Sequence, residues 1–343
     1  MARTVAARTG RARGAGVALA VALLGAVGAS LWVGSADLSV AHVGDALLRR
    51  GTPLSETIVW QLRLPRTLLA IAVGGGLAVV GVAMQALVRN PLAEPYILGA
   101  SSGASAGAAL FYLGFLPPLV SAAVSMPLAA VVGAWGAVAL VFAAARTGPV
   151  LSTARLLLAG VAMSALLGSV TAFVTYASPE PDKLRAVLFW LLGSLGRARW
   201  GLLWGPLAAS LGGAIVLWRL ARPLDLLTTG EEPAAALGVP VEALKRTLIL
   251  LAAVMTGLLV SASGVIGFVG LIVPHGVRLL AGAGHVRLVP LAWAGGALFL
   301  LLADIAARTV LPGQDVPVGV LTALCGVPFF LALLRRRDVA ALG

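Results

Sequence analysis

Ten apolar runs, each close to the length of a membrane-crossing helix, place the strongest constraint on the fold of this chain. A helix needs about 20 consecutive apolar residues to cross a hydrocarbon core about 30 Å thick. The runs lie at roughly 15–33, 67–88, 97–116, 119–145, 156–176, 201–218, 247–263, 265–281, 288–307 and 317–334. They predict an all-α polytopic membrane protein with about ten transmembrane helices.

The composition agrees with a membrane protein and argues against a soluble one. Of the 343 residues, 60% are apolar and 11% are charged, whereas a soluble domain has about 25% charged residues. The net charge of +12 does not indicate a nucleic-acid partner, because the basic residues stand in small groups between the runs and form no single patch. No long polar stretch separates the runs, so we expect one transmembrane domain over residues 1–343.

Two of the runs differ from a simple span. Four arginines precede the first run, as they would in a cleavable signal peptide, but we expect an uncleaved anchor. The run at 265–281 contains Pro274, His275 and Arg278, and we expect a broken or half-length helix there. Arg66-Thr67-Leu68 and Arg246-Thr247-Leu248 each open a glycine-bearing span, one from each side, which allows an inverted internal repeat.

The distribution of lysine and arginine favours an orientation with both termini in the cytoplasm. With ten spans, sixteen of the 25 basic residues lie on the cytoplasmic side, including Arg335, Arg336 and Arg337, as the positive-inside rule requires. The other nine are expected outside: Arg49, Arg50, Arg63, Arg66, Lys183, Arg185, Arg197, Arg199 and Arg308. These outer charges need either solvent or an acidic partner.

Several chemistries are excluded by residues that the chain lacks. A phosphate-binding P-loop needs Gly-Lys followed by Ser or Thr, and neither Lys183 nor Lys245 follows a glycine. The three histidines form no His-Glu-x-x-His pair and there is one cysteine, so we expect no metal site and no bound cofactor. Ser261 or Ser263 with His275 resembles an intramembrane protease dyad only superficially, and we expect no catalytic residue.

Four motifs in the second to tenth runs are more specific. They are Leu64-Pro65-Arg66, the turn from Gln85 through Asn90-Pro91-Leu92-Ala93 to Pro95, the segment Gly267-Phe268-Val269-Gly270-Leu271 with Pro274-His275, and Pro317-Val318-Gly319-Val320. In this order, from about residue 60 to residue 337, they resemble the permease subunit of binding-protein-dependent ABC importers for ferric siderophores, haem and cobalamin. The resemblance implies ten spans, a homodimer, two cytoplasmic ATP-binding subunits and a periplasmic or lipid-anchored substrate-binding protein.

The resemblance also implies roles for two groups of residues. Arg63, Arg66 and Arg308 match outer arginines that pair with acidic residues of the binding protein. The cytoplasmic loop at 219–246, between spans two to six (67–218) and spans seven to ten (247–334), resembles the segment that fits into the ATPase subunits. Within that loop the coupling residues are Glu231, Glu232, Ala235, Ala236, Leu237 and Gly238, and Pro233 suits the first turn of a helix.

The translocation pathway is less visible in the sequence. Its candidates are the small or weakly polar residues Gln85, Asn90, Ser101, Ser102 and Ser105. Each has an alternative explanation as a helix-packing residue.

Asp304 stands inside an apolar span, which suggests a function. Arg308 follows one helical turn later and offers a simple intrahelical partner instead.

We therefore expect a subunit that imports a ferric siderophore or related iron complex across the cytoplasmic membrane, with haem or cobalamin as the alternative cargo. A secondary transporter would need intramembrane carboxylates, of which only Asp304 qualifies. An intramembrane enzyme would need a convincing catalytic pair.

Overall fold

The computed structural model describes residues 2–335 apart from 35, 37, 148–149, 179 and 312. Arg336 and Arg337, which the orientation argument uses, lie outside the described residues. The first half contains α1 (Ala2–Trp32), α2 (Val40–Leu47), α3 (Pro53–Thr57), the π-helical η1 (Ile58–Arg63), α4 (Leu64–Val88), the 3-10 helix η2 (Pro95–Leu98), α5 (Ala100–Tyr112), α6 (Pro118–Ala123), α7 (Met126–Ala145), β1 (Arg146–Thr147), β2 (Val150–Leu151) and α8 (Thr153–Tyr176). The second half contains α9 (Pro181–Leu191), α10 (Trp200–Arg219), α11 (Ala221–Leu227), α12 (Glu231–Ala236), α13 (Val241–Ser263), α14 (Val269–Ala281), α15 (His285–Ala307) and α16 (Val318–Arg335).

The prediction of an all-α membrane protein is confirmed. Each of the ten apolar runs contains helical structure. In the described part of the chain, seven helical segments are long and apolar enough to cross a membrane: α1, the stretch from α3 to α4, α7, α8, α10, α13 and α15. The other three, α5, α14 and α16, are shorter, so the count of ten spans stays a prediction.

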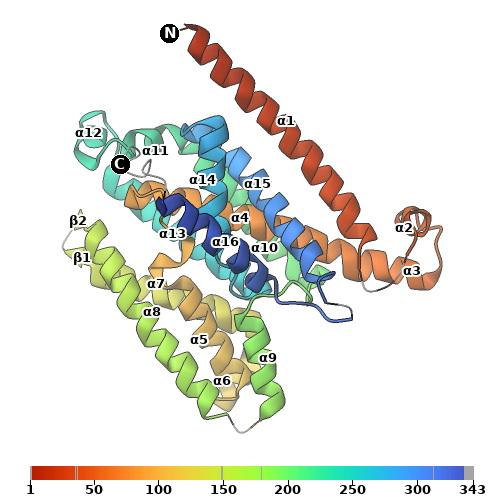
Figure 1. Cartoon of the computed structure of the whole chain (residues 1–343). Helices are drawn as coiled ribbons and strands as arrows, with labels where there is room; N and C mark the ends of the chain where they lie inside the picture. Colours follow the sequence, from red (N-terminus) through yellow and green to blue (C-terminus); the bar gives the residue numbers. More distant parts are fainter. Residues whose placement is uncertain are drawn as a thin grey trace.

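Helix α4 forms the centre of the bundle. It continues α3 and η1 without a break, which gives a 36-residue stretch from Pro53 to Val88 whose most apolar window is 89% buried. Helices α10, α13, α14 and α15 pack around it (Figure 1). Glycine permits this density, because a Cβ added at Gly74 would collide with the backbone of Gly296 on α15. Small residues at such crossings let helices associate in lipid through close backbone contact.

Helices α1 and α8 differ from α4 because most of their surface is uncovered. Only 17% of the apolar window of each is buried inside the chain. Helix α8 packs against α5 and α7, and Figure 1 shows it at the edge of the bundle. These apolar faces need lipid or another protein to cover them.

The run at 265–281 is a short helix, as the sequence predicted, and an extended segment precedes it. Helix α13 ends at Ser263, and Gly264 and Phe268 both have left-handed backbone angles with φ of 68°. The turn after α4 holds this segment in place: the Tyr96 hydroxyl donates to the carbonyl of Ile266 (2.8 Å), and the amide of Phe268 donates to the Glu94 carboxylate (3.1 Å). A non-helical segment inside a membrane protein requires such partners for its backbone.

Three boundaries differ from the sequence expectation. The second span begins well before residue 67, since helical structure starts at Pro53. The run at 119–145 is divided into α6 and α7. The loop at 219–246 contains α11, α12 and the first turns of α13. The reason in each case is that hydropathy marks where apolar residues stop, whereas a helix ends where its backbone hydrogen bonds end.

Candidate functional sites

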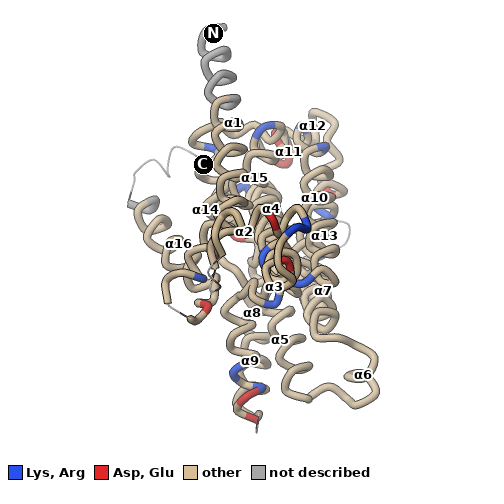
Figure 2. The backbone as a smooth tube through the Cα atoms, turned by 90° about the vertical axis from the view of Figure 1, so that its right-hand side faces the viewer, with Lys and Arg blue, Asp and Glu red and all other residues tan. Residues whose placement is uncertain are grey.

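In Figure 2 the charged residues lie mainly around α11 and α12, around α2 and α3, and on α9. We name the two ends of the bundle after the predicted orientation. The outer end contains α2, α3, α9 and the end of α15, and the inner end contains α11, α12, the β1–β2 hairpin and the end of α4. Each end has a cluster of buried ions.

The outer cluster surrounds Asp304, whose side chain is fully buried. Nη2 of Arg66 lies 2.9 Å from one Asp304 oxygen, and Nη2 of Arg308 lies 3.1 Å from the other. Arg66 also pairs with Asp315 at 2.5 Å. Two arginines on one enclosed carboxylate neutralise it and satisfy its lone pairs, and a buried charge requires both.

Arg63 and Arg308 hold the end of α1. Arg63 is buried and donates to the carbonyls of Leu31 (2.8 Å) and Trp32 (2.7 Å), and it also reaches Ala36. Arg308 donates to the carbonyls of Ser30 (3.2 Å) and Val33 (3.1 Å) and to the Ser30 hydroxyl (2.8 Å). The last carbonyls of a helix have no partner within the helix and bear partial negative charge. The two guanidinium groups therefore cap α1.

The structure thus brings Arg63, Arg66 and Arg308 together at one end and gives each an intramolecular partner. The intrahelical pair of Asp304 with Arg308 matches the sequence expectation. The pair of Arg66 with Asp304 was not expected, because 238 positions separate the two residues. A role of the three arginines in docking stays a prediction.

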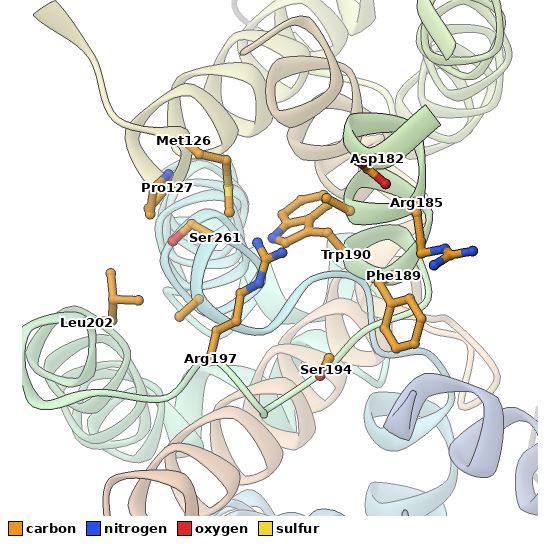
Figure 3. Close-up of a pocket in the computed structure, with 12 residues that line it drawn as sticks. Met126, Pro127, Asp182, Arg185, Phe189, Trp190, Ser194, Arg197, Leu202 and Ser261 are labelled. Atoms are coloured by element: carbon orange, nitrogen blue, oxygen red, sulfur yellow. The ribbon is translucent and has the colours of Figure 1, made fainter. Parts of the chain in front are cut away.

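A second outer feature is a pocket of about 310 Å³ between α9, the start of α7 and the end of α13. Arg197 extends across it toward Trp190 and Ser261 (Figure 3). The indole nitrogen of Trp190 is buried and has no hydrogen-bond partner among the described residues. Asp182 and Arg185 also line the pocket from α9, and in Figure 3 the Arg185 guanidinium points away from Arg197.

The inner cluster has the opposite arrangement, with one buried amine between two carboxylates. The Lys245 side chain is 1% exposed, and its Nζ lies 2.9 Å from Glu231 and 2.9 Å from Glu242. It also donates to the carbonyl of Leu151 (2.7 Å). Lys245 therefore ties α12, α13 and the β1–β2 hairpin together.

The predicted coupling residues form α12 and the turn that follows it. Gly230 precedes the helix with φ of 133°, and Gly238 follows it with φ of 85°. Both angles are accessible to glycine and strained for other residues. Ala234 lies on the buried face of α12. The solvent-facing residues are Glu232, Pro233, Ala235, Ala236, Leu237 and Gly238.

The predicted pathway residues lie in different surroundings. Gln85 is buried and bridges helices, since its amide donates to the carbonyl of Gly270 (3.2 Å) and its oxygen accepts from Arg278. Asn90 is exposed and accepts a hydrogen bond from the amide of Leu92 (2.9 Å). The serines of α5 are partly buried: Ser101, Ser102 and Ser105. Their place on a pathway stays a prediction.

Comparison with known proteins agrees with this architecture. A profile of the FecCD transport family matches residues 20–336. The chain belongs to the FecCD transport family. It is 43% identical over 306 residues to the cobalamin import permease BtuC of Halobacterium salinarum, covering 89% of this chain and 80% of that protein. It is 45% identical over 282 residues to the hemin permease HmuU of Yersinia pestis, covering 81% and 84%.

A solved structure has the same fold. It is a metal-chelate type ABC transporter in an inward-facing conformation, with 34% sequence identity and a TM-score of 0.82. The match covers 93% of this chain and 97% of that one. As a FecCD family member, the chain is a permease subunit of an ABC importer in the inner membrane, and it is a transporter component rather than an enzyme.

The arrangement of this FecCD permease also separates the residues of the imagined protease dyad. Ser261 lines the outer pocket, and His275 lines a different cavity at the inner end. Ser263 donates its hydroxyl to the carbonyl of Leu259 (3.0 Å). Neither serine is placed to pass a proton to His275.

Sequence analysis did not predict three features: the Arg66–Asp304 pair, the ion cluster around Lys245 and the cavity at the inner end that His275 lines. Glu242, three residues before Lys245 on a predicted helix, is a signal that could have identified part of the cluster around Lys245, because residues three apart lie on the same helix face. The cavity joins segments far apart in the sequence and has no local signature.

Proposed function

We propose that the chain is the translocating subunit of an ATP-driven importer for a ferric siderophore or a related iron complex. The observation that carries the proposal is the exposed small-residue face of α12, held rigidly by Lys245 on a chain without a nucleotide-binding motif. Such a surface suits close contact with a separate ATPase. Small side chains let a partner approach the backbone closely, so movement of the partner is transmitted to α13.

Haem or cobalamin is the second candidate cargo. Relatives that share 40–45% of their residues with this chain are named as cobalamin or hemin permeases. The three cargoes share a chelated metal in a bulky organic ligand. The names favour the second candidate and the family as a whole allows the first.

The proposed assembly is a homodimer with two cytoplasmic ATP-binding subunits and a periplasmic or lipid-anchored binding protein. The uncovered apolar side chains of α8 and α16 support a second copy: Leu158, Val161 and Leu166 on α8, and Leu324 and Leu331 on α16. The serines of α5, which packs against α8, are proposed to line the pathway with Gln85 and Asn90. ATP binds to the partner subunits, and this chain needs no cofactor.

We propose that the binding protein docks at the outer end through Arg63, Arg66 and Arg308. Asp315 is 42% exposed beside Arg66, so an acidic side chain of the binding protein would approach Arg66 by displacing Asp315. Arg63 and Arg308 are enclosed, so their present contacts would have to open before an acidic side chain could pair with them. An ion pair at the exposed rim contributes about 0–1 kcal/mol and chiefly sets the register and rate of docking.

Charge reversal at Arg63 and Arg66 is expected to weaken binding-protein docking and uptake. Because Arg63 caps α1 and Arg66 pairs with the buried Asp304, the melting temperature of each variant must be measured beside docking, and a loss of docking counts only where the protein still melts like the wild type. Reversal of the exposed Arg199 is the matched control. If the double variant docks the binding protein as tightly as the wild type does, the arginines have no role in docking.

Transport itself is tested in proteoliposomes that contain the chain, its ATPase and its loaded binding protein. We expect vanadate-sensitive, ATP-dependent uptake of a ferric siderophore, haem or cobalamin, tested side by side. Uptake driven by an ion gradient without ATP would contradict the proposed function.

A further inference from the structure

A cavity of about 630 Å³ opens at the inner end and is strongly cationic. It lies between the last turn of α4, the end of α11, the second half of α14 and the start of α15. Arg89 and Arg278 line it together with His275 and His285. None of the described residues that line it is acidic.

The cations of this cavity are only partly used by the protein. One nitrogen of the Arg278 guanidinium donates to the Gln85 amide oxygen, and this neutral partner leaves the charge uncompensated. Arg89 is exposed, and its contact with Glu231 is long at 4.0 Å. A guanidinium offers five N–H donors in a planar fork that matches the oxygens of phosphate.

The two histidines have buried ring nitrogens that a bound polar group could satisfy. His275 is 4% exposed, and both of its ring nitrogens lack a hydrogen-bond partner among the described residues. The Nδ1 of His285 lies 2.6 Å from Asp225, and its Nε2 has no partner in the same part of the chain. Buried polar atoms without partners are rare in folded proteins, and a bound ion, ligand or water commonly satisfies them.

We propose that this inner cavity binds a phosphate group, with Arg278 and Arg89 as its principal ligands and the two histidines beside them. The phosphate belongs either to the head group of an anionic phospholipid or to free inorganic phosphate. Gln85 and Asn90, which are proposed pathway residues, also line this cavity, and Arg89 contacts Glu231 of the coupling segment, so the phosphate site adjoins both.

The surroundings favour the lipid as the source. Basic pockets between helices on the cytoplasmic side are typical sites for anionic head groups. Leu279 and Leu280 line the same cavity and are about two-thirds exposed. An apolar groove of about 260 Å³ lies between α10 and α15, and Trp218 at its edge donates to the carbonyl of Val286, next to His285 (3.1 Å). An acyl chain would find apolar surface beside the cavity.

The test uses the purified, delipidated full chain with three probes: phosphatidylglycerol, phosphatidylcholine and inorganic phosphate. Native mass spectrometry measures lipid affinity and a thermal shift measures phosphate binding. We expect phosphatidylglycerol to bind, and about tenfold weaker binding in Arg278→Gln, because a charged hydrogen-bonding partner is lost. Arg287→Gln is the matched control, an exposed arginine of the same end that does not line the cavity.

A second variant protects the test against misfolding. Arg278 also contacts Gln85, whereas Arg89 is exposed, so Arg89→Gln should weaken binding without a change in the melting temperature of the lipid-free protein. Arginine-dependent lipid binding identifies a head group, and an arginine-dependent phosphate shift without lipid preference identifies free phosphate. The proposal is overturned if neither probe binds, or if both variants bind like the wild type.

Discussion

Each end of the molecule has one buried ion between two ions of the opposite charge, and the buried ion is negative at the outer end and positive at the inner end. At the outer end one carboxylate, Asp304, is enclosed by the cations of Arg66 and Arg308. At the inner end one amine, Lys245, lies between the carboxylates of Glu231 and Glu242. Both central groups are buried, so the difference lies in their partners.

The outer partners are enclosed, whereas the inner ones reach water. The Arg66 and Arg308 side chains are 13% and 5% exposed, and those of Glu231 and Glu242 are 31% and 34% exposed. If Asp304 is lost, Arg308 is left as an enclosed charge and Arg66 keeps only Asp315 as its acidic partner, whereas the inner carboxylates can be hydrated if Lys245 is lost. The outer cluster therefore locks α1, α4 and α15 to one another. The inner cluster supports α12 and leaves the exposed face of this helix open to a partner.

Asp304→Asn should cause the largest loss of stability that we predict, because it removes the carboxylate that joins Arg66 to Arg308. Removing one partner of a buried ion pair costs about 3–5 kcal/mol, so the variant should melt far below the wild type or fail to purify. Thermal melting in detergent checks this, with Asp182→Asn on α9 as the exposed control. An unchanged melting temperature would show that the cluster is solvated and does not lock the helices.

A smaller loss is expected for Lys245→Met. The two carboxylates that remain are about one-third exposed, so water compensates them in part, and we expect a cost of about 1–3 kcal/mol. Thermal melting beside Asp304→Asn checks the order of the two, and Lys183→Met on the exposed end of α9 is the control. If Lys245→Met is the more damaging, the comparison between the two ends is reversed.

Arg63→Lys tests whether Arg63 caps the C-terminal end of α1. Lysine keeps the charge but lacks the planar fork that reaches several carbonyls at once, so we expect a loss of about 1–2 kcal/mol. Proteolysis near residue 33 should become faster in parallel with a lower melting temperature. Arg199→Lys should change neither, and equal behaviour of the two variants would show that Arg63 does not cap α1.

The smallest effect concerns Asp225 on α11. Burial alone would raise the pKa of Asp225, but hydrogen bonds from His285 outweigh burial and lower this pKa. A lowered pKa in the folded state adds stability above the ordinary pKa, near 4, and this stability is lost as the pH falls through the lowered value. The difference in melting temperature between wild type and Asp225→Asn should therefore be present at pH 7 and shrink below about pH 4. A difference independent of pH would contradict this assignment.

The sequence predicted the class of fold well because lipid imposes a length and an apolar character on every span. It also placed Pro233 in the first turn of a short helix, since proline acts locally. The partners of Asp304 show the limit. Arg308 is one turn away and was expected, whereas Arg66 is brought to Asp304 only by the packing of α4 against α15, which no local pattern encodes.

The inner end shows the same limit. Glu231 was predicted as a coupling residue, but its pairing with Lys245 depends on how α12 folds back onto α13. His275 belongs to a motif that the sequence revealed, and its unsatisfied nitrogens became visible only with the cavity around it. Tertiary contacts decide such features, and one sequence does not specify them by spacing.

The most direct test of the account asks whether the open face of α12 couples to the ATPase. Ala235→Trp fills the small-residue face, and Ala122→Trp places the same bulk on an exposed alanine of α6 at the outer end. ATP hydrolysis stimulated by the loaded binding protein is measured in the reconstituted complex. We predict that Ala235→Trp loses the stimulation while melting like the wild type, and that Ala122→Trp keeps it. Normal stimulated hydrolysis in Ala235→Trp would contradict the account.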